Sequence, residues 1–247
     1  MTQLKNNQLV KVAVLGASGY LGGKVCEKVN ELGLVVIKLG RTLTKEDLSQ
    51  TPPNLIIDAA FPTSKITKEI KFKYLQDLSQ NLEIAINNDL RYLYLGSYSS
   101  HPMSRSKYGR LKQQAERMVL LKGANILRVG LVIDPSNPKG RYYQVLRIAK
   151  SLPFTPVLPE NWCPIYTTTL TNFNLEIDRS ILNQNVNSIN YIGIRESINL
   201  LLQGSNESRR KCIIPASILS IGRHLSKIIP LGPLDFVKSI LYKEEKF

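Results

Sequence analysis

The chain has 247 residues, of which 43% are hydrophobic and 21% charged, and a formal net charge of +14 at pH 7. This composition is ordinary for a globular protein, and the length allows one large domain or a domain with a smaller lobe. No apolar run approaches the ~20 residues of a membrane-spanning helix, and the opening residues lack the apolar stretch of a signal peptide. We therefore expect a cytoplasmic protein without a membrane span.

The positive charge is compatible with a nucleic acid, an anionic surface or an acidic small molecule as the partner. Because the lysines and arginines are scattered and form no dense arm, a nucleic-acid partner is not expected. The three cysteines, Cys26, Cys163 and Cys212, lie far apart, and neither histidine has an acidic cluster beside it. These spacings do not match a metal site, so we expect buried thiols and no bound metal.

A short apolar run that ends at Leu15 is followed by three evenly spaced glycines. This order is typical of a buried strand, a tight turn and a helix start, where a nucleotide phosphate can bind the N–H groups of the helix N-terminus. The spacing Gly-x-x-Gly-x-x-Gly differs from the commoner Gly-x-Gly-x-x-Gly, and glycines also close ordinary strand-to-helix turns. We predict a dinucleotide site formed by Gly16, Ser18, Gly19, Tyr20, Leu21 and Gly22.

Apolar residues at strand or helix spacing continue from this turn to about residue 129. The predicted strands are 12–15, 34–39, 55–58, 91–95 and 124–129, and the predicted helices are 20–32, 44–47, 66–87 and one that begins near Tyr108. Because strands and helices alternate, we predict an α/β fold with a doubly wound, parallel, Rossmann-type sheet. The small residues Ala59 and Ala60 follow one strand and would let the backbone pass close to a cofactor.

Arg41 follows the second predicted strand, which in a Rossmann fold ends beside the adenosine ribose. An acidic residue there would accept the 2′-hydroxyl of NAD, but the position holds none, and an arginine can pair with a 2′-phosphate. We therefore predict NADP as the cofactor, with NAD as the alternative. The other interpretation of Arg41 is a solvent-exposed loop residue.

Prolines become frequent after Asp134, and the apolar pattern becomes less regular. The predicted elements of this part are helices at 141–152, 170–182 and 196–202 and a strand at 188–194. Residues 1–135 would form the NAD(P)-binding Rossmann domain. Residues 136–247 would form a small C-terminal substrate lobe that is partly interleaved with the sheet.

Ser97 follows a predicted strand, and Tyr108 and Lys112 lie four residues apart on one face of the next helix. An ammonium group beside a tyrosine favours the phenolate, so such a tyrosine can exchange a proton with a substrate oxygen while a nicotinamide exchanges hydride with the attached carbon. Ser97 would hold that oxygen by a hydrogen bond, and Lys112 would also bind the nicotinamide ribose. The other interpretation of Tyr108 and Lys112 is a surface pair on an amphipathic helix.

Five segments carry a resemblance to a known family: GASGYLG at 16–22, DAA at 58–60, YLGSYSS at 94–100, YGRLKQQAE at 108–116 and LRVGLVIDP at 127–135. In this order they resemble the extended short-chain dehydrogenases/reductases, the NAD-dependent epimerase/dehydratase family that includes dTDP-4-dehydrorhamnose reductase and the nucleotide-sugar epimerases. The resemblance implies that Ser97 is the family's serine or threonine, with Ser99 as its rival, and that Tyr108 is the acid/base and Lys112 its partner. It also implies that Val129 and Leu131 flank the nicotinamide, and that a homodimer forms through the helix of Tyr108 and the long helix before it.

Two features depart from the sugar-nucleotide enzymes of this family. Ser97 and Tyr108 are separated by only 11 positions, and only about a hundred residues follow Pro135. We therefore predict an NAD(P)-dependent oxidoreductase that acts on a carbonyl or alcohol of a small molecule, nucleotide-sugars included. The alternatives are a nucleotide-sugar epimerase or dehydratase with a tightly held cofactor, and a non-catalytic NADP-binding sensor or scaffold. Candidates for contact with a substrate diphosphate are Arg105, Arg110, Lys139 and Arg141.

Overall fold

The structure is a computed structural model of the whole chain. It describes residues 10–62, 66–100, 106–137, 142–143, 146–147, 155–157, 164–182, 189–197 and 211–213. The chain divides into two compact units, which are considered separately. The first, called the sheet unit, contains the chain up to Gly96, then Leu111–Arg128 and Asn174–Tyr191. The second unit contains Ser97–Arg110, Val129–Phe173 and the chain from Ile192 onward.

A six-stranded sheet forms the centre of the sheet unit, with the strand order β2-β1-β3-β4-β5-β9. Its strands are β1 (Lys11–Leu15), β2 (Val35–Leu39), β3 (Leu55–Asp58), β4 (Arg91–Ser97), β5 (Asn125–Val129) and β9 (Ile189–Ile192). The pairs β1–β2, β1–β3 and β3–β4 are parallel. The predicted Rossmann-type α/β fold is confirmed, and the carboxyl ends of these parallel strands share one edge of the sheet.

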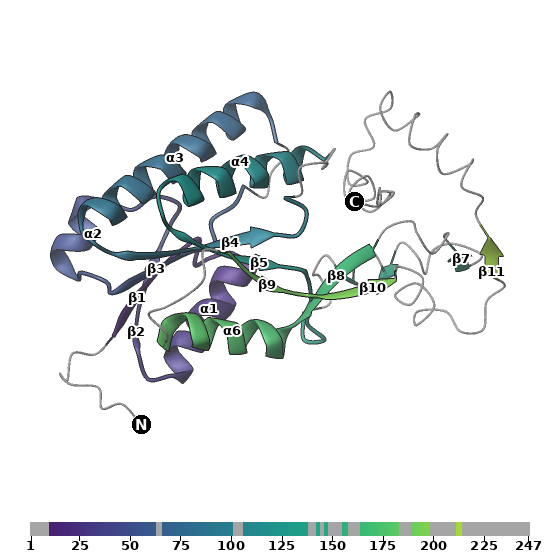
Figure 1. Cartoon of the computed structure of the whole chain (residues 1–247). Helices are drawn as coiled ribbons and strands as arrows, with labels where there is room; N and C mark the ends of the chain where they lie inside the picture. Colours follow the sequence, from purple (N-terminus) through teal and green to yellow (C-terminus); the bar gives the residue numbers. More distant parts are fainter. Residues whose placement is uncertain are drawn as a thin grey trace. The chain divides into compact units, whose positions relative to one another are not determined.

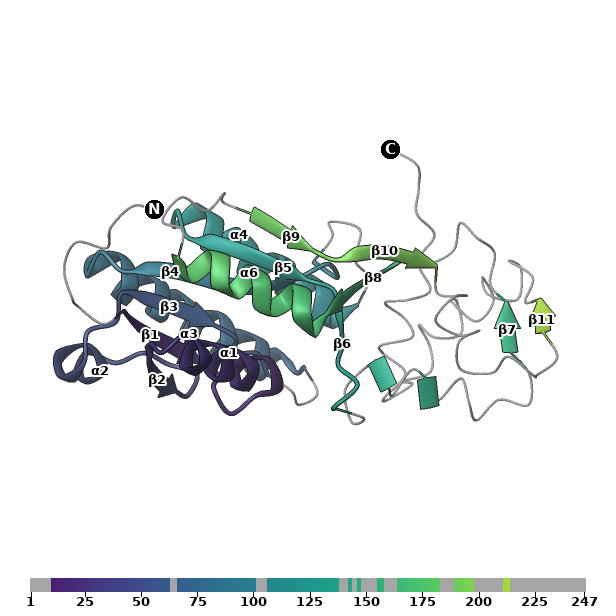
Figure 2. The ribbon, with the colours of Figure 1, turned by 90° about the horizontal axis from the view of Figure 1, so that it is seen from below.

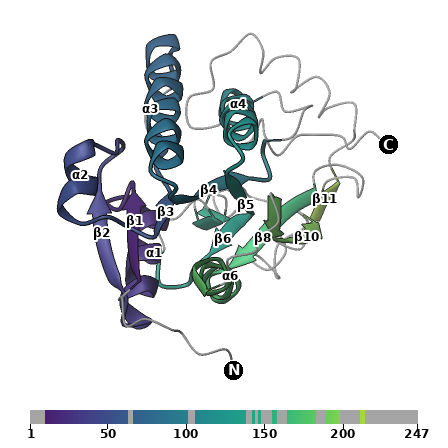
Figure 3. The same ribbon diagram turned by 60° about the vertical axis from the view of Figure 1, so that its left-hand side comes forward.

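The helices that lie wholly or in part in this unit are α1 (Tyr20–Glu31), α2 (Lys45–Gln50), α3 (Lys68–Asn87), α4 (Lys107–Leu121) and α6 (Leu170–Leu182). Helices α3 and α4 cover one face of the sheet, and α1 and α6 cover the other (Figure 1). Figure 2 shows α1 and α6 on the near face, and Figure 3 shows the same two layers seen along the strands. Because both faces are covered, β3 is buried along its whole length, from Leu55 to the carboxyl group of Asp58.

Local sequence signals explain where the helices begin and end. Thr44 accepts a hydrogen bond from the backbone of Asp47, whose side chain accepts one in return, so a capping box begins α2. Thr67 caps α3 by accepting a hydrogen bond from the Ile70 backbone. After α1, Gly33 adopts φ +70°, a left-handed conformation that glycine enters at little cost.

The second unit contains a three-stranded sheet in the order β10-β8-β6, built from β6 (Leu131–Ile133), β8 (Pro164–Thr169) and β10 (Ile194–Ser197). A two-stranded sheet joins β7 (Thr155–Val157) to β11 (Lys211–Ile213). The predicted helix at 196–202 is wrong at its start, because β10 pairs with β8 antiparallel up to Ser197. Pairing with a distant strand outweighs the local helical spacing.

Other expectations for this half are met only in part. Helix α6 has the predicted bounds, whereas the predicted strand at 188–194 is interrupted at Gly193 between β9 and β10. Residues 142–143 and 146–147 are helical, and the rest of the predicted helix at 141–152 and residues 198–202 lie outside the described residues. Cys26 is buried as predicted, and Cys163 lies outside the described residues. In the described part of the chain, the helices are too short or too polar to cross a membrane.

Candidate functional site

The turn after β1 requires glycine at two positions. Gly16 adopts φ +72°, and a Cβ added there would lie 2.7 Å from the Ala60 Cα. A Cβ at Gly22 would collide with the carbonyl oxygen of Gly16, so Gly22 lets α1 pack directly on the turn. The Gly16 N–H donates to the Gly40 carbonyl oxygen at 2.5 Å, which connects the turn to the end of β2. The predicted turn is therefore shaped by close backbone approach rather than by flexibility.

The N-terminus of α1 opens from this turn. Its N-cap is Gly19, no side chain within the described ranges caps it, and its first turn contains no acidic residue. Ser18, Gly19 and Tyr20 are exposed, whereas Leu21 is half-buried. The partial positive charge of a helix N-terminus favours an anion here, and glycine lets the anion approach the backbone closely.

Arg41 lies in the exposed segment after β2, and α3 holds this segment in place. The Asn81 side chain on α3 is buried, donates to the Arg41 carbonyl oxygen at 2.9 Å and accepts from the Leu43 N–H at 2.8 Å. Arg41 also lines a small hollow together with Asp58, Ala60, Tyr74, Asp77, Leu78 and Asn81. Sequence reasoning missed Asn81, although a lone amide among the apolar positions of α3 was a usable signal.

At the end of β3, Asp58 is a buried carboxyl group that shapes the backbone after it. One oxygen accepts from the Ala60 N–H at 2.8 Å, and the other accepts from the Tyr92 hydroxyl at 2.5 Å. Burial raises the pKa of Asp58 to about 6, although both hydrogen bonds and the positive charge of Lys112 act to lower it. Ala60, predicted to lie beside a cofactor, therefore has a backbone fixed by Asp58 on one side and packed against Gly16 on the other.

Lys112 on α4 extends into the sheet unit and is only 5% exposed. Its Nζ donates to the Leu95 carbonyl oxygen near the carboxyl end of β4 at 2.8 Å. The same nitrogen lies 4.5 Å from the centre of the Tyr94 ring and 4.7 Å from that of Phe61, within the range of cation–π attraction. An exposed helix lysine is thus excluded as the interpretation of Lys112.

Tyr108 lies one helical turn before Lys112 on α4 and is half-buried. The division of the chain passes through this helix, so Tyr108 belongs to the second unit and Lys112 to the sheet unit. Ser97 and Val129 also belong to the second unit, as the last residues of β4 and β5.

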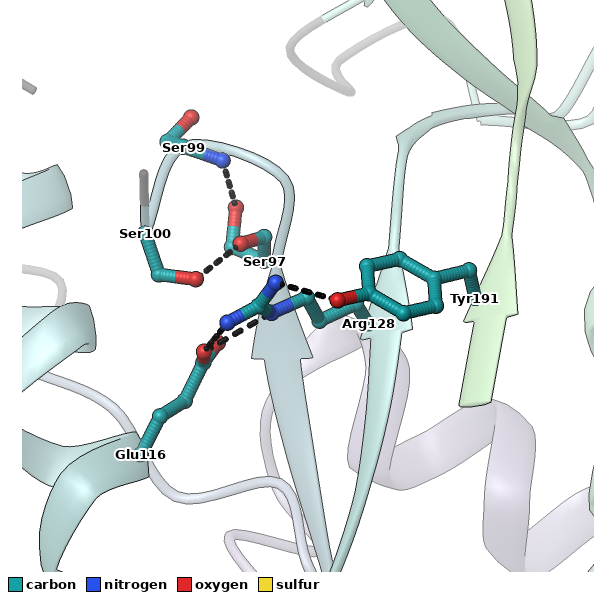
Figure 4. A network of polar contacts seen from close by, with 6 residues as sticks. All are labelled: Ser97, Ser99, Ser100, Glu116, Arg128 and Tyr191. Atoms are coloured by element: carbon teal, nitrogen blue, oxygen red, sulfur yellow. Dashed lines mark hydrogen bonds and ion pairs between the residues drawn. The ribbon is translucent and has the colours of Figure 1, made fainter. Parts of the chain in front are cut away.

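The segment after β4 is organised by serine contacts within the second unit. The Ser97 hydroxyl accepts from the Ser99 N–H at 3.2 Å, and the Ser100 hydroxyl donates to the Ser97 carbonyl oxygen at 2.6 Å (Figure 4). Ser97 and Ser99 are both half-buried, whereas Ser100 is fully buried. Ser97 and Ser99 therefore both remain candidates for the serine that would hold the substrate oxygen.

An ion pair between a half-buried arginine and a buried glutamate joins α4 to the sheet within the sheet unit. The Arg128 guanidinium on β5 donates to Glu116 on α4 from Nε at 2.8 Å and from Nη2 at 2.7 Å, and Nη1 donates to the Tyr191 hydroxyl on β9 at 2.8 Å (Figure 4). A Cβ at Gly96 would lie 2.5 Å from a Glu116 oxygen, so glycine on β4 makes room for this carboxylate. Sequence reasoning missed this pair. The usable signal was that Glu116 lies one helical turn after Lys112, on the same face of α4.

Comparison with known proteins gives matches at the level of structure. No protein-family model and no curated protein matches the sequence. An NAD-dependent NDP-hexosamine 5,6-dehydratase of tunicamycin biosynthesis has a TM-score of 0.63 at 15% identity over 83% of this chain and 84% of its own. A dTDP-4-dehydrorhamnose reductase from Clostridium acetobutylicum has 0.63 at 13% over 84% and 85%. A UDP-N-acetylglucosamine 4-epimerase from Bacillus cereus has 0.62 at 15% over 85% and 89%.

These likenesses define a class of fold. The chain shares its Rossmann-type architecture with solved epimerases, dehydratases and reductases that act on nucleotide sugars, which is the group that its motifs resemble. At 13–15% identity the likeness concerns the fold.

Proposed function

We propose that this chain is an NAD(P)-dependent oxidoreductase of the extended short-chain type, which transfers hydride to or from a carbonyl or alcohol. The observation that carries the proposal is the placement of Lys112. Its ammonium group is anchored near the carboxyl end of β4, in the unit that contains the glycine turn, and Tyr108 precedes it by one helical turn. Burying an ammonium group costs free energy, and a role in the reaction would explain why the chain buries this one.

The residues of the turn fit a dinucleotide. Gly16 and Gly22 leave no space for a Cβ, and the uncapped N-terminus of α1 is suited to a pyrophosphate. When bound, the dinucleotide would supply the hydride acceptor or donor. NADP is the preferred form, because Arg41 lies in the segment that would meet the adenosine ribose. NAD remains the alternative, and it is the cofactor named for the tunicamycin dehydratase.

In the proposed chemistry, the Tyr108 phenol gives or takes the proton of the substrate oxygen. The Lys112 ammonium favours the phenolate form and binds the nicotinamide ribose. Ser97, or its rival Ser99, holds the same oxygen by a hydrogen bond. Val129 lies beside the nicotinamide. Each of these roles follows the resemblance of the motifs.

The proposed substrate is a ketone or the corresponding alcohol, with a nucleotide-sugar as the first class to test. The three structural relatives described above are named for nucleotide-sugar substrates. The alternative is an epimerase or dehydratase that reoxidises its own cofactor, which should co-purify with bound dinucleotide. The homodimer and the cytoplasmic location remain predictions from the sequence.

The test measures cofactor-dependent turnover of a panel of nucleotide-sugar ketones and simple ketones. Turnover is monitored by the change in NADPH absorbance. We expect Tyr108→Phe to lose roughly 10²-fold or more in turnover while it retains cofactor binding, because the phenol acts only in proton transfer. Retention of full turnover by Tyr108→Phe would contradict the proposed mechanism.

A further inference from the structure

Five titratable side chains are buried together in the sheet unit, none of them more than 7% exposed. They are Asp58 from β3, Tyr92 and Tyr94 from β4, Tyr74 from α3 and Lys112 from α4. Hydrogen bonds join Asp58 to Tyr92 and, at 2.7 Å, Tyr74 to Tyr94. Strands buried on both faces are usually apolar, and a buried charge is costly unless it is paired.

Asp58 connects this cluster to the glycine turn. Its carboxyl group accepts from the Ala60 N–H at 2.8 Å, which fixes the direction of the chain immediately after β3. The Ala60 Cα and nitrogen are the atoms that a Cβ at Gly16 would meet, at 2.7 and 2.8 Å. The carboxyl group therefore holds the backbone against which the turn packs.

Asp58 also interacts with Lys112. The Lys112 ammonium contacts the Leu95 carbonyl oxygen and the faces of two aromatic rings. Asp58 carries a negative charge when ionised, and the positive charge of Lys112 favours that form. The carboxylate and the ammonium thus stabilise each other inside the unit.

We propose that Asp58 is a positioning residue of the cofactor site, which fixes the Ala60 backbone against Gly16 and supplies a negative charge that favours the Lys112 ammonium. This inference rests on the proposed function, because it gives Asp58 a role toward a bound dinucleotide. The ionised carboxyl group is the active form, since only it accepts two hydrogen bonds and opposes the lysine charge.

The role of Asp58 depends on pH. Because burial raises its pKa to about 6, the carboxyl group loses its charge as the pH falls through that value. The titratable or charged groups that face it are Tyr92 from β4, Lys112 from α4, Tyr74 and Asp77 from α3 and Arg41 after β2. The support that Asp58 gives to cofactor binding is therefore present above about pH 7 and lost below about pH 5.

The experiment compares NADP binding by the full chain and by Asp58→Asn, using calorimetric titration at about pH 8 and about pH 5.5, with thermal unfolding at the same values. At the higher pH we expect the variant to bind roughly fivefold or more weakly at a temperature at which it remains folded. The affinity ratio should fall toward one at the lower pH. Using this ratio cancels the titration of the 2′-phosphate of NADP itself.

Two further variants sharpen the comparison. Asp178→Asn removes a carboxylate that pairs with Lys28 at 3.2 Å in the same unit, and it should leave the NADP affinity within about twofold. Tyr92→Phe keeps the Asp58 carboxyl but removes a hydrogen bond that favours its ionised form, so NADP affinity should begin to fall at a higher pH than in the wild type. It tests the proposal even where Asp58→Asn does not fold.

The outcomes separate this inference from the proposed function. Equal affinities of the wild type and Asp58→Asn at about pH 8 would overturn the positioning role while leaving dinucleotide binding intact. An affinity ratio that is the same at both pH values would assign Asp58 a merely structural role and would also overturn it. Failure of the wild type to bind NADP or NAD would overturn both proposals.

Discussion

The buried amide of Asn81 on α3 donates a hydrogen bond to the carbonyl oxygen of Arg41 at 2.9 Å. A buried side chain on α3 thus fixes the segment that follows β2. This is the segment that we propose to discriminate between NADP and NAD. The same side chain accepts from the Leu43 N–H, so two backbone groups depend on it. Neither partner is adjacent to Asn81 in sequence.

Asn81→Leu should destabilise the protein by about 1–3 kcal/mol, because the buried Leu43 N–H loses its acceptor. It should also weaken any preference for NADPH, since the Arg41 backbone is no longer fixed. Urea unfolding measures the first effect. Asn88→Ala is the matched control: Asn88 is exposed and bonds the Ile84 carbonyl oxygen, so we expect a loss below about 0.5 kcal/mol. Similar losses in both variants would refute this view of Asn81.

Gly22→Ala should abolish dinucleotide binding, because the new methyl group would collide with the Gly16 backbone, which cannot move without opening the turn. Gly33→Ala provides the control at the other end of α1. It introduces strain at φ +70° but meets no atom within 4 Å, so it should cost about 1 kcal/mol of stability and leave binding unchanged. Equal binding by both variants would contradict the placement of the cofactor at this turn.

Arg128→Met should destabilise the protein by about 1–3 kcal/mol, because the buried Glu116 carboxylate loses this ion-pair partner. Removing both charges with Glu116→Gln and Arg128→Met should restore part of that loss. Arg179→Met interrupts an exposed pair with Glu176 and should change stability by less than about 1 kcal/mol. Chemical denaturation of the three variants tests this, and a small loss for Arg128→Met would show that the Glu116–Arg128 pair does not hold α4 to the sheet.

Stability should depend on pH through Asp58. Its pKa is about 6 in the folded chain against the ordinary value of 3.8, so the folded state binds the proton more tightly than the unfolded state. The stabilisation from protonation is complete below about pH 4 and is lost as the pH rises through about 6, a change on the order of 3 kcal/mol. The difference in unfolding free energy, wild type minus Asp58→Asn, should therefore decrease from about pH 4 to about pH 7. A constant difference would contradict the raised pKa.

The sequence predicts those features that depend on neighbours along the chain. The glycine spacing indicates the turn at Gly16, the alternation of strands and helices indicates the Rossmann-type sheet, and the four-residue interval places Tyr108 and Lys112 on one helix face. The capping of α2 by Thr44 is equally local. Each signal acts within a few residues, so it is readable without the fold.

Features that join distant segments were missed. The strand that begins at Ile194 exists because it pairs with β8, about thirty residues earlier, and its own spacing favours a helix. The partners of Asp58 and Arg128 come from other strands and helices, and only the fold brings them together. The buried environment of Lys112 also depends on Phe61 and Tyr94, which belong to separate elements.

The most direct measurement is a fluorescence titration with NADPH and NADH on the wild type, Arg41→Ala and Tyr108→Phe. We predict that the wild type binds NADPH more tightly than NADH, that Arg41→Ala removes this preference, and that Tyr108→Phe binds as the wild type does. If neither dinucleotide binds the wild type at micromolar concentrations, the turn at Gly16 is a structural turn only, and the proposed oxidoreductase function is wrong.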